Sequence, residues 1–180
     1  MSTMISMLRG VNVGGHNKIK MTELKALYES LGFTDVQTYI QSGNVVFKTS
    51  AKDSAKLGKK IGEAIEKKCG FCPEVMVRTS EELRAIIARN PFAKRKDVEP
   101  GKLVVMFLAT DPGDAARRAV VKVDVVDEEI KPDGNEIYIY FPHGQGQSKL
   151  KYGQVDKAIN KVAWTGRNLN TVMKLAELSA

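Results

Sequence analysis

The stretch TYIQSGNVVF at residues 38–47 decides the fold, because it predicts a β-hairpin in the middle of a mixed pattern. Val36, Thr38 and Ile40 alternate with polar neighbours, as in a half-buried strand. Ser42-Gly43-Asn44 supplies turn residues, and Val45 to Phe47 continues as a second strand. The elements on either side of this hairpin then define the first lobe.

A helix is expected on each side of the hairpin. Apolar residues recur at helical spacing over 24–31, with Thr22 placed to cap the start, and again over 57–65. Short strands are expected outside them, at 4–9 and 74–78. The order β-α-β-β-α-β is that of a ferredoxin-like fold. We therefore predict a ferredoxin-like lobe at residues 1–79.

Residues 80–101 are expected to connect this lobe to a second one. Thr79 and Glu82 have the spacing of a capping box at the start of a helix, and a charged linker follows at 94–101. The second lobe, 102–180, should contain a strand at 103–109, a short helix capped by Asp111, a hairpin formed by 123–130 and 136–141, and helices at 149–162 and 168–178.

The predicted fold class is therefore α+β, with two tandem ferredoxin-like (βαββαβ-type) lobes, antiparallel sheets and an additional C-terminal helix. The two halves match in element order and not in detectable sequence. We expect the second lobe to lack its final strand and to end in helix instead.

Composition excludes several classes of protein. The chain has 180 residues, 43% hydrophobic and 7% aromatic, which is enough to bury a core and unlike a disordered tail. The chain contains no run of about 18 uncharged apolar residues, so no membrane span is expected. Residues 1–9 are too short, and lack the basic start, for a signal peptide. We expect a cytoplasmic protein without a membrane association.

The net charge of +7 is unevenly distributed. Residues 110–136 hold eight acids and four bases, a net charge of −4, so the rest of the chain carries +11. A basic excess attracts phosphate-bearing partners and also keeps proteins soluble. Six lysines at 52–68 are first interpreted as one solvated helix face.

The cysteines and histidines give little sign of redox, metal or acid–base chemistry. Cys69 and Cys72 resemble a redox pair, but they follow a predicted helix, whose C-terminal dipole opposes a thiolate. Reduced, partly buried thiols are the favoured alternative. No metal-ligand spacing occurs, so no metal site is expected. His16 and His143 have no assignable nucleophile partner, and no cofactor is indicated.

The densest polar segment is LRGVNVGGHNKIKM at residues 8–21, which joins a strand to a helix. Backbone N–H groups and a helix dipole can hold an anion at such a position. Gly10 and Gly15 have the spacing of a P-loop, but His16 and Asn17 stand where Lys and Ser or Thr belong. Nucleoside triphosphate hydrolysis of the P-loop type is therefore not expected.

Two interpretations of this loop remain open. In the first, Gly14-Gly15 exposes backbone donors while Arg9, Asn12, Lys18 or Lys20 grips a phosphate or carboxylate. In the second, the glycines make a tight loop and the side chains of Asn12 and Asn17 bond their own backbone.

Two further polar groups could join the loop. Gln41, Ser42 and Asn44 could reach a ligand or simply close the hairpin turn. At 165–171, Asn168 or Thr165 could cap the last helix, whereas capping does not explain Arg167, which could donate a bidentate contact.

Five segments closely resemble the bacterial family known as domain of unknown function 1697. They are LRGVNVGGHNKIKM at 8–21, TYIQSGNVVF at 38–47, NPF at 90–92, SKL at 148–150 and GRNLNTVMKL at 166–175. The resemblance implies a cytosolic protein of two ferredoxin-like lobes and no established reaction. His16 stands where such sequences commonly carry Lys, and Leu169 where Trp is frequent. The motif residues that it marks are Arg9, Asn12, Gly14, Gly15, Lys18, Lys20, Gln41, Ser42, Asn44, Arg167, Asn168 and Asn170.

Three functions compete. The first is binding of a small anionic or phosphate-bearing ligand, a nucleotide or metabolite, at the glycine-rich loop together with Arg167, with enzymatic activity left open. The second is nucleic-acid binding, for which the strand at 4–9 offers no aromatic residue to stack a base. The third is a structural or protein-binding role, in which the acidic 110–136 region meets a basic surface of a partner or a second copy.

Overall fold

The computed structural model describes residues 1–180. Its contacts divide the chain into two compact units. Unit 1 comprises residues 1–84 and 174–180, and unit 2 comprises residues 85–173. The last residues of the chain thus pack with the first unit, where the hydroxyl of Ser80 lies 3.0 Å from both the backbone oxygen and the hydroxyl of Ser179.

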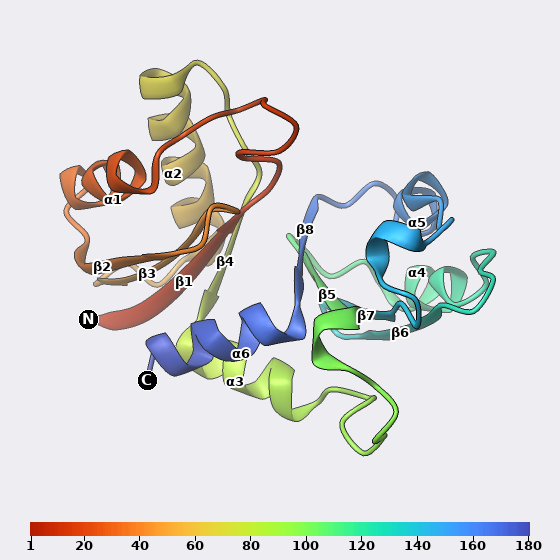
Figure 1. The fold of residues 1–180 in the computed structure, drawn as a ribbon. Coiled ribbons are helices and arrows are strands. Elements are labelled where there is room, and N and C mark those ends of the chain that lie inside the picture. The colour runs from red at the N-terminus through yellow and green to blue at the C-terminus, as the bar shows by residue number, and fades with distance from the viewer. The chain divides into compact units, whose positions relative to one another are not determined.

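Unit 1 is a four-stranded antiparallel sheet with two helices on one face (Figure 1). The strand order is β2-β3-β1-β4, with β1 in the centre pairing both β3 and β4. The elements are β1 (Ser2–Leu8), α1 (Met21–Ser30), β2 (Thr34–Tyr39), β3 (Asn44–Thr49), α2 (Ser54–Cys69) and β4 (Val75–Thr79).

The core of unit 1 lies between the sheet and its helices. Alternate residues of β1 and β3, such as Met4, Leu8 and Phe47, pack with Leu24 of α1 and Ile61 of α2. The residues between them in the strands point to the opposite face, as the two-residue period of a strand requires. Among them, Ile5, Met7 and Val46 are apolar and buried as well, Ile5 and Met7 completely.

Helix α3 (Ser80–Ala88) leads out of β4 and begins with the predicted capping box. The Thr79 N–H donates to Glu82 at 2.7 Å, and the Glu82 N–H donates to the Thr79 hydroxyl at 3.0 Å. Beyond it, the NPF motif anchors the charged linker in unit 2: Phe92 is fully buried, and Arg95 donates to both carboxylate oxygens of Glu129. The linker is therefore fixed to the sheet of unit 2.

Unit 2 repeats the same topology, with strand order β6-β7-β5-β8 and every neighbouring pair antiparallel. Its elements are the 3-10 turns η1 (Pro100–Lys102) and η2 (Gln145–Gln147), strands β5 (Leu103–Leu108), β6 (Glu129–Asp133), β7 (Glu136–Tyr140) and β8 (Trp164–Asn168), and helices α4 (Asp114–Val120), α5 (Tyr152–Ala158) and α6 (Leu169–Leu178). The prediction of an α+β protein with two tandem ferredoxin-like lobes is confirmed.

One expectation about unit 2 is wrong, because the final strand is present. β8 pairs antiparallel with β5: Asn168 lies opposite Val104 at one end of the pairing, and Trp164 lies opposite Leu108 at the other. Helix α6 follows β8 directly. The sequence obscured this strand, since WTGRN contains a glycine, and Thr165 and Asn168 resemble the caps of a helix. α6 is therefore an addition to a complete βαββαβ unit.

Three local expectations also need correction. The helix expected at 149–162 is confined to Tyr152–Ala158, and the left-handed residues Asn160 and Lys161 lie just beyond it. Gly113, and not Asp111, is the N-cap of α4. Helix α1 begins at Met21, so Thr22 lies inside it and the N-cap is Lys20, which gives no side-chain cap. None of the six helices is both long and apolar enough to cross a membrane.

Candidate functional site

The loop between β1 and α1 folds back on itself as a small hairpin. Val13 and His16 form an isolated antiparallel bridge around Gly14 and Gly15, and the His16 N–H donates to Val13 O at 3.0 Å. Both glycines have positive φ, 57° and 77°, which a two-residue turn of this twist requires. Neither glycine N–H donates a hydrogen bond within the protein, so the tip of the loop presents two free backbone donors.

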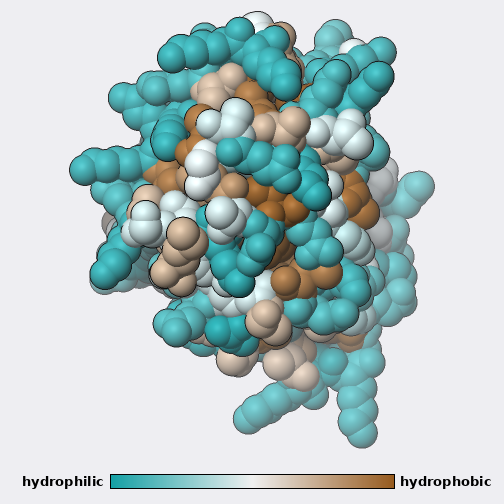
Figure 2. Space-filling view, turned by 90° about the vertical axis from the view of Figure 1, so that its left-hand side faces the viewer, coloured by the Kyte–Doolittle hydropathy of each residue, from teal (hydrophilic) through white to brown (hydrophobic).

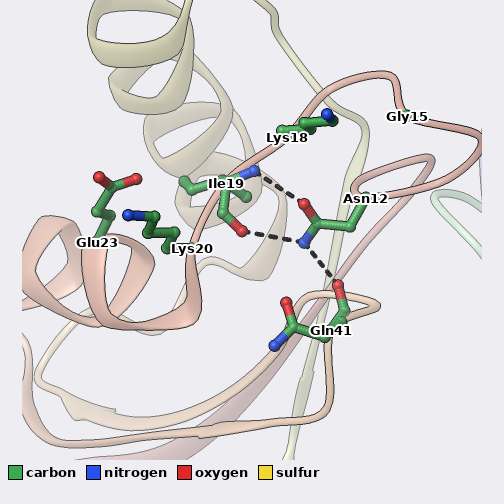
Figure 3. Close-up of a pocket in the computed structure, with 7 residues that line it drawn as sticks. All are labelled: Asn12, Gly15, Lys18, Ile19, Lys20, Glu23 and Gln41. Atoms are coloured by element: carbon green, nitrogen blue, oxygen red, sulfur yellow. Dashed lines mark hydrogen bonds between the residues drawn. The ribbon is translucent and has the colours of Figure 1, made fainter.

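Asn12 fixes the base of this hairpin. Its Oδ1 accepts from the Ile19 N–H at 2.9 Å, while its Nδ2 donates to Ile19 O at 3.0 Å and to Gln41 O at 2.8 Å (Figure 3). Asn17 Nδ2 also donates, to Gly10 O at 3.1 Å. The Asn12 and Asn17 amides thus bond the backbone, as the second interpretation of the loop expects. Asn12 joins the loop to the β2–β3 turn.

The β2–β3 turn is packed tightly against the start of the loop. Gly43 has φ +82°, its carbonyl accepts from the Leu8 N–H at 2.9 Å, and a Cβ at this position would lie 2.7 Å from Val11 Cγ2. Asn44, fully buried, donates to Tyr39 O and to the Ser42 hydroxyl, both at 3.0 Å. The Asn44 side chain therefore closes the turn from inside.

A cavity of about 490 Å³ lies between the loop, the start of α1 and the β2–β3 turn, all within unit 1. Seven residues line it: Asn12, Gly15, Lys18, Ile19, Lys20, Glu23 and Gln41. In Figure 3, Lys18 borders it on the side of Gly15, Lys20 and Glu23 border it on the side of α1, and Gln41 lies below. Five of the predicted motif residues, Asn12, Gly15, Lys18, Lys20 and Gln41, thus meet at one cavity.

The two lysines of the cavity have no acidic partner. Neither Lys18 nor Lys20 has a carboxylate oxygen within 4.0 Å of its ammonium nitrogen, and both residues are exposed. The first turn of α1 borders the same cavity, and its backbone N–H groups receive no side-chain acceptor from the N-cap residue Lys20. Backbone N–H groups without partners at a helix N-terminus favour negative charge. The two lysine ammonium groups and these backbone amides therefore both favour an anion in the cavity.

The remaining motif residues of unit 1 lie around this cavity without lining it. Arg9 is exposed just after β1, and its N–H donates to Glu74 O at 2.9 Å. Gly14 belongs to the hairpin tip, whereas Ser42 and Asn44 close the β2–β3 turn. His16, where related sequences commonly carry Lys, is exposed on the hairpin.

The three motif residues of unit 2 have different surroundings. Arg167 lies on β8 with only 8% of its surface exposed, and it donates to the Thr165 hydroxyl and to Gly166 O. Burial lowers the pKa of Arg167 to about 10. Asn168 accepts from the Thr171 N–H at 3.0 Å and so caps α6, while Asn170 is exposed. The convergence of Arg167 with the loop of unit 1 stays a prediction.

Glu23 and Ile19 line the cavity but were not among the residues expected there. Glu23 stands in the first turn of α1, which begins one residue before the expected cap. An acid in the first turn directly after a basic loop was the available signal. The Ile19 side chain is buried in the core, so that residue faces the cavity through the loop backbone.

The other candidate groups lie elsewhere. His143 Nε2 lies 2.6 Å from Asp127 Oδ2 on the surface of unit 2. Cys69 and Cys72 are free thiols, and desolvation together with nearby carboxylates, Glu66 among them, raises the pKa of Cys72. A raised thiol pKa disfavours the reactive thiolate. No group of three or more His, Cys, Asp or Glu residues is placed to hold a metal ion.

The acidic segment 110–136 is largely engaged within unit 2. Arg117 binds Asp111 and Asp114, each at 2.7 Å, while Arg89 lies within 3.4 Å of both Asp133 and Glu136. Glu129 is held by Arg95, Asp127 by His143, and Glu128 accepts from the Ser148 hydroxyl at 2.6 Å. Seven of its eight acids thus have partners inside the unit, which leaves little unpaired acidic surface.

Comparison with models of protein families assigns the chain to one family. The model of the family described as "Protein of unknown function (DUF1697)" matches residues 1–138, which include the loop, the β2–β3 turn and the cavity. The chain belongs to the DUF1697 family. The resemblance to this family is therefore confirmed, with three of the five quoted motifs inside the matched residues, and the family description assigns no reaction.

A solved structure supports the fold of this DUF1697 protein. The conserved bacterial protein SP0830 from Streptococcus pneumoniae is similar with a TM-score of 0.70 and 23% sequence identity, over 99% of each chain. At this identity the similarity shows the fold alone. No curated protein matches the chain.

Proposed function

We propose that unit 1 binds a small ligand carrying a phosphate or carboxylate group in the cavity beside the glycine-rich loop. The observation that carries the proposal is the convergence of Lys18 and Lys20, neither with an acidic partner, at the uncapped N-terminus of α1. Charge-assisted hydrogen bonds from lysine and from helix amides are the usual means of holding such groups.

The supports of the cavity favour binding because they are already in place without a ligand. The three hydrogen bonds of Asn12 hold Ile19, between the two lysines, and the Gln41 backbone in fixed positions. A ligand then has less loop ordering to oppose its binding. The lysines themselves are exposed, so solvent and salt weaken their attraction, and we expect affinity to fall as ionic strength rises.

The proposal is tested by isothermal titration of the full chain with inorganic phosphate, phosphorylated metabolites and nucleotides. The double variant Lys18→Gln/Lys20→Gln should bind the best compound at least about 10-fold more weakly, a loss of roughly 1.4 kcal/mol. Lys25→Gln is the matched control, because Lys25 lies on α1 outside the cavity and is half exposed. Absence of binding across the whole panel by the wild-type protein overturns the proposal.

Nucleic-acid binding, the second function considered, has less support. The face of the unit 1 sheet opposite its helices carries Ile5, Met7 and Val46, which are aliphatic and at most 4% exposed. Bases need exposed aromatic platforms for stacking. Figure 2 shows many hydrophilic side chains on the side of unit 1 that carries α1, so any attraction of a polyanion to this side is electrostatic and independent of base sequence.

A protein partner for the acidic segment also has less support than the cavity, since seven of its eight acids are engaged inside unit 2.

A cytoplasmic location is part of the proposal that unit 1 binds a phosphorylated ligand, because phosphorylated metabolites are cytoplasmic compounds.

A further inference from the structure

We infer that the ligand of this cavity is a phosphorylated polyol, such as a sugar phosphate, and not a nucleotide. The inference rests on the proposed function and narrows it. It comes from Glu23 and Gln41, which line the same cavity as the two lysines and which a site for phosphate alone would not need.

Glu23 supplies hydrogen-bond acceptors and negative charge next to the cations. Its carboxylate has no cation within 4.0 Å and accepts no hydrogen bond from the protein. An ionised carboxylate only accepts, so its natural partner on a ligand is a hydroxyl or an amine. With two lysines and one glutamate, the lining has a formal charge of +1. This charge suits the lower negative charge of a single phosphate monoester better than the higher charge of a polyphosphate, which Glu23 repels more strongly.

Gln41 supplies both a donor and an acceptor, as hydroxyl groups require. Its side-chain amide makes no hydrogen bond within the protein, and in Figure 3 it extends from the turn away from Asn12, on the side where Lys20 and Glu23 lie. The backbone beneath it is fixed, because Asn12 holds the Gln41 carbonyl.

The residue before Gln41 shows that this position is enforced. Ile40 has φ +51°, a left-handed conformation that is rare for a β-branched residue and unfavourable by about 1–3 kcal/mol. Asn44 holds the Tyr39 carbonyl on one side of Ile40, and Asn12 holds the Gln41 carbonyl on the other. The turn therefore keeps Gln41 beside the cavity despite the strain.

The lining offers no surface on which a nucleobase could stack. No aromatic side chain borders the cavity, and Ile19, its one apolar residue, is 3% exposed. Bases are held by stacking together with hydrogen bonds to their edges. A cavity of about 490 Å³ has the size of an ordinary small-molecule site, and it is lined by groups that pair with phosphate and hydroxyls.

The test compares affinities of the full chain for inorganic phosphate, glycerol 3-phosphate, glucose 6-phosphate, glucose and AMP by isothermal titration. The wild-type protein should bind at least one polyol phosphate at least about 10-fold more tightly than inorganic phosphate or AMP. Glu23→Gln and Gln41→Leu should each reduce this preference severalfold while binding of inorganic phosphate is retained. Glu29→Gln is the control, because Glu29 is exposed on α1 outside the cavity, and it should keep the full preference.

The possible failures are distinguishable. Equal affinity for phosphate and the polyol phosphates, tighter binding of AMP, or an unchanged preference in both Glu23→Gln and Gln41→Leu overturns the inference and leaves anion binding standing. Absence of binding by any phosphate compound overturns the proposed function itself. Thermal unfolding by circular dichroism identifies a variant that fails to fold, in which case Glu23→Asp or Gln41→Met replaces it in the same comparison.

Discussion

The two units share one topology but join the first strand to the first helix in different ways. In unit 1, twelve residues separate β1 from α1, and they fold into a hairpin with free glycine amides and two lysines without acidic partners. In unit 2, five residues separate β5 from α4, and Arg117 of α4 binds Asp111 and Asp114. Charge is thus left unpaired in one connection and neutralised in the other.

The difference between the two connections distinguishes residues that stabilise the fold from residues available for binding. Both sheets have the same strand order and largely buried central strands, β1 and β3 in unit 1 and β5 and β7 in unit 2, so the fold does not require the longer connection. The longer connection adds polar groups without internal partners, and it is rigidified by Asn12 from the loop and by Gly43 from the neighbouring turn. Binding residues are frequently found in loops held by a rigid scaffold.

The largest expected effect concerns the two hairpin turns. Gly43→Ala should destabilise the protein by about 2–4 kcal/mol, because the new Cβ meets Val11 at 2.7 Å and Leu8 Cβ at 3.0 Å in a left-handed backbone. Gly134→Ala, in the β6–β7 turn, also has positive φ but has only the Glu136 side-chain oxygen near its Cβ, at 4.0 Å, and should cost only about 1 kcal/mol. Urea unfolding followed by circular dichroism measures both. Equal losses would show that the tight contact at Gly43 is unimportant.

The second effect concerns the fixing of the loop. Asn12→Ala removes three hydrogen bonds and leaves both backbone groups of Ile19 without their partner, so we expect a loss of about 2–3 kcal/mol. Asn17→Ala removes one exposed hydrogen bond and should cost at most about 1 kcal/mol. Urea unfolding of both variants tests the ranking. If Asn17→Ala is the more damaging change, Asn12 is not the residue that fixes the loop.

Much of the fold could be predicted from the sequence because it depends on local patterns. Helical spacing, the Thr79–Glu82 capping box and the hairpin at 38–47 are all present as predicted. β8 was missed because it is defined by its pairing with β5, between residues 56 to 64 positions apart in the sequence, and not by its own composition. The start of α1 was misplaced by two residues, with Thr22 expected as the N-cap where Lys20 stands, because no side chain caps this helix.

The candidate site was predictable only in part, for a similar reason. The unusual loop composition revealed Gly15, Lys18 and Lys20, but the distinction between a binding residue and a supporting residue depends on hydrogen bonds. Asn12 and Gln41 are both amides of the motif; the first has its side chain fully engaged, and the second has a free side chain. Sequence does not separate them, since the bonds of Asn12 to Ile19 and to Gln41 O form only once the loop and the β2–β3 turn have folded together.

A smaller effect concerns pH and the short connection of unit 2. The Gly113 N–H and the Arg117 guanidinium lower the pKa of Asp111 below its usual range. Because this pKa is lower in the folded than in the unfolded state, the stabilisation is complete above the unfolded pKa of about 4 and is lost as pH falls through the folded pKa. Asp111→Asn should therefore make the free energy of unfolding fall less steeply between about pH 5 and pH 2, the range in which carboxylates titrate. Urea unfolding at a series of pH values measures this slope. Asp124→Asn, which removes no hydrogen bond or ion pair, should leave the slope unchanged.

The smallest effect on stability should come from the residues to which we assign binding. Lys18→Gln/Lys20→Gln removes two exposed ammonium groups with no acidic partner, so the free energy of unfolding should change by less than about 0.5 kcal/mol while phosphate compounds bind at least about 10-fold more weakly. Arg117→Gln in unit 2 should do the reverse, because it breaks contacts to Asp111, Asp114 and Gly134 O without touching the cavity. Parallel urea unfolding and phosphate titration of the two variants measure this contrast. A large stability loss in the lysine variant would mean that the long connection serves the fold, as the short one does.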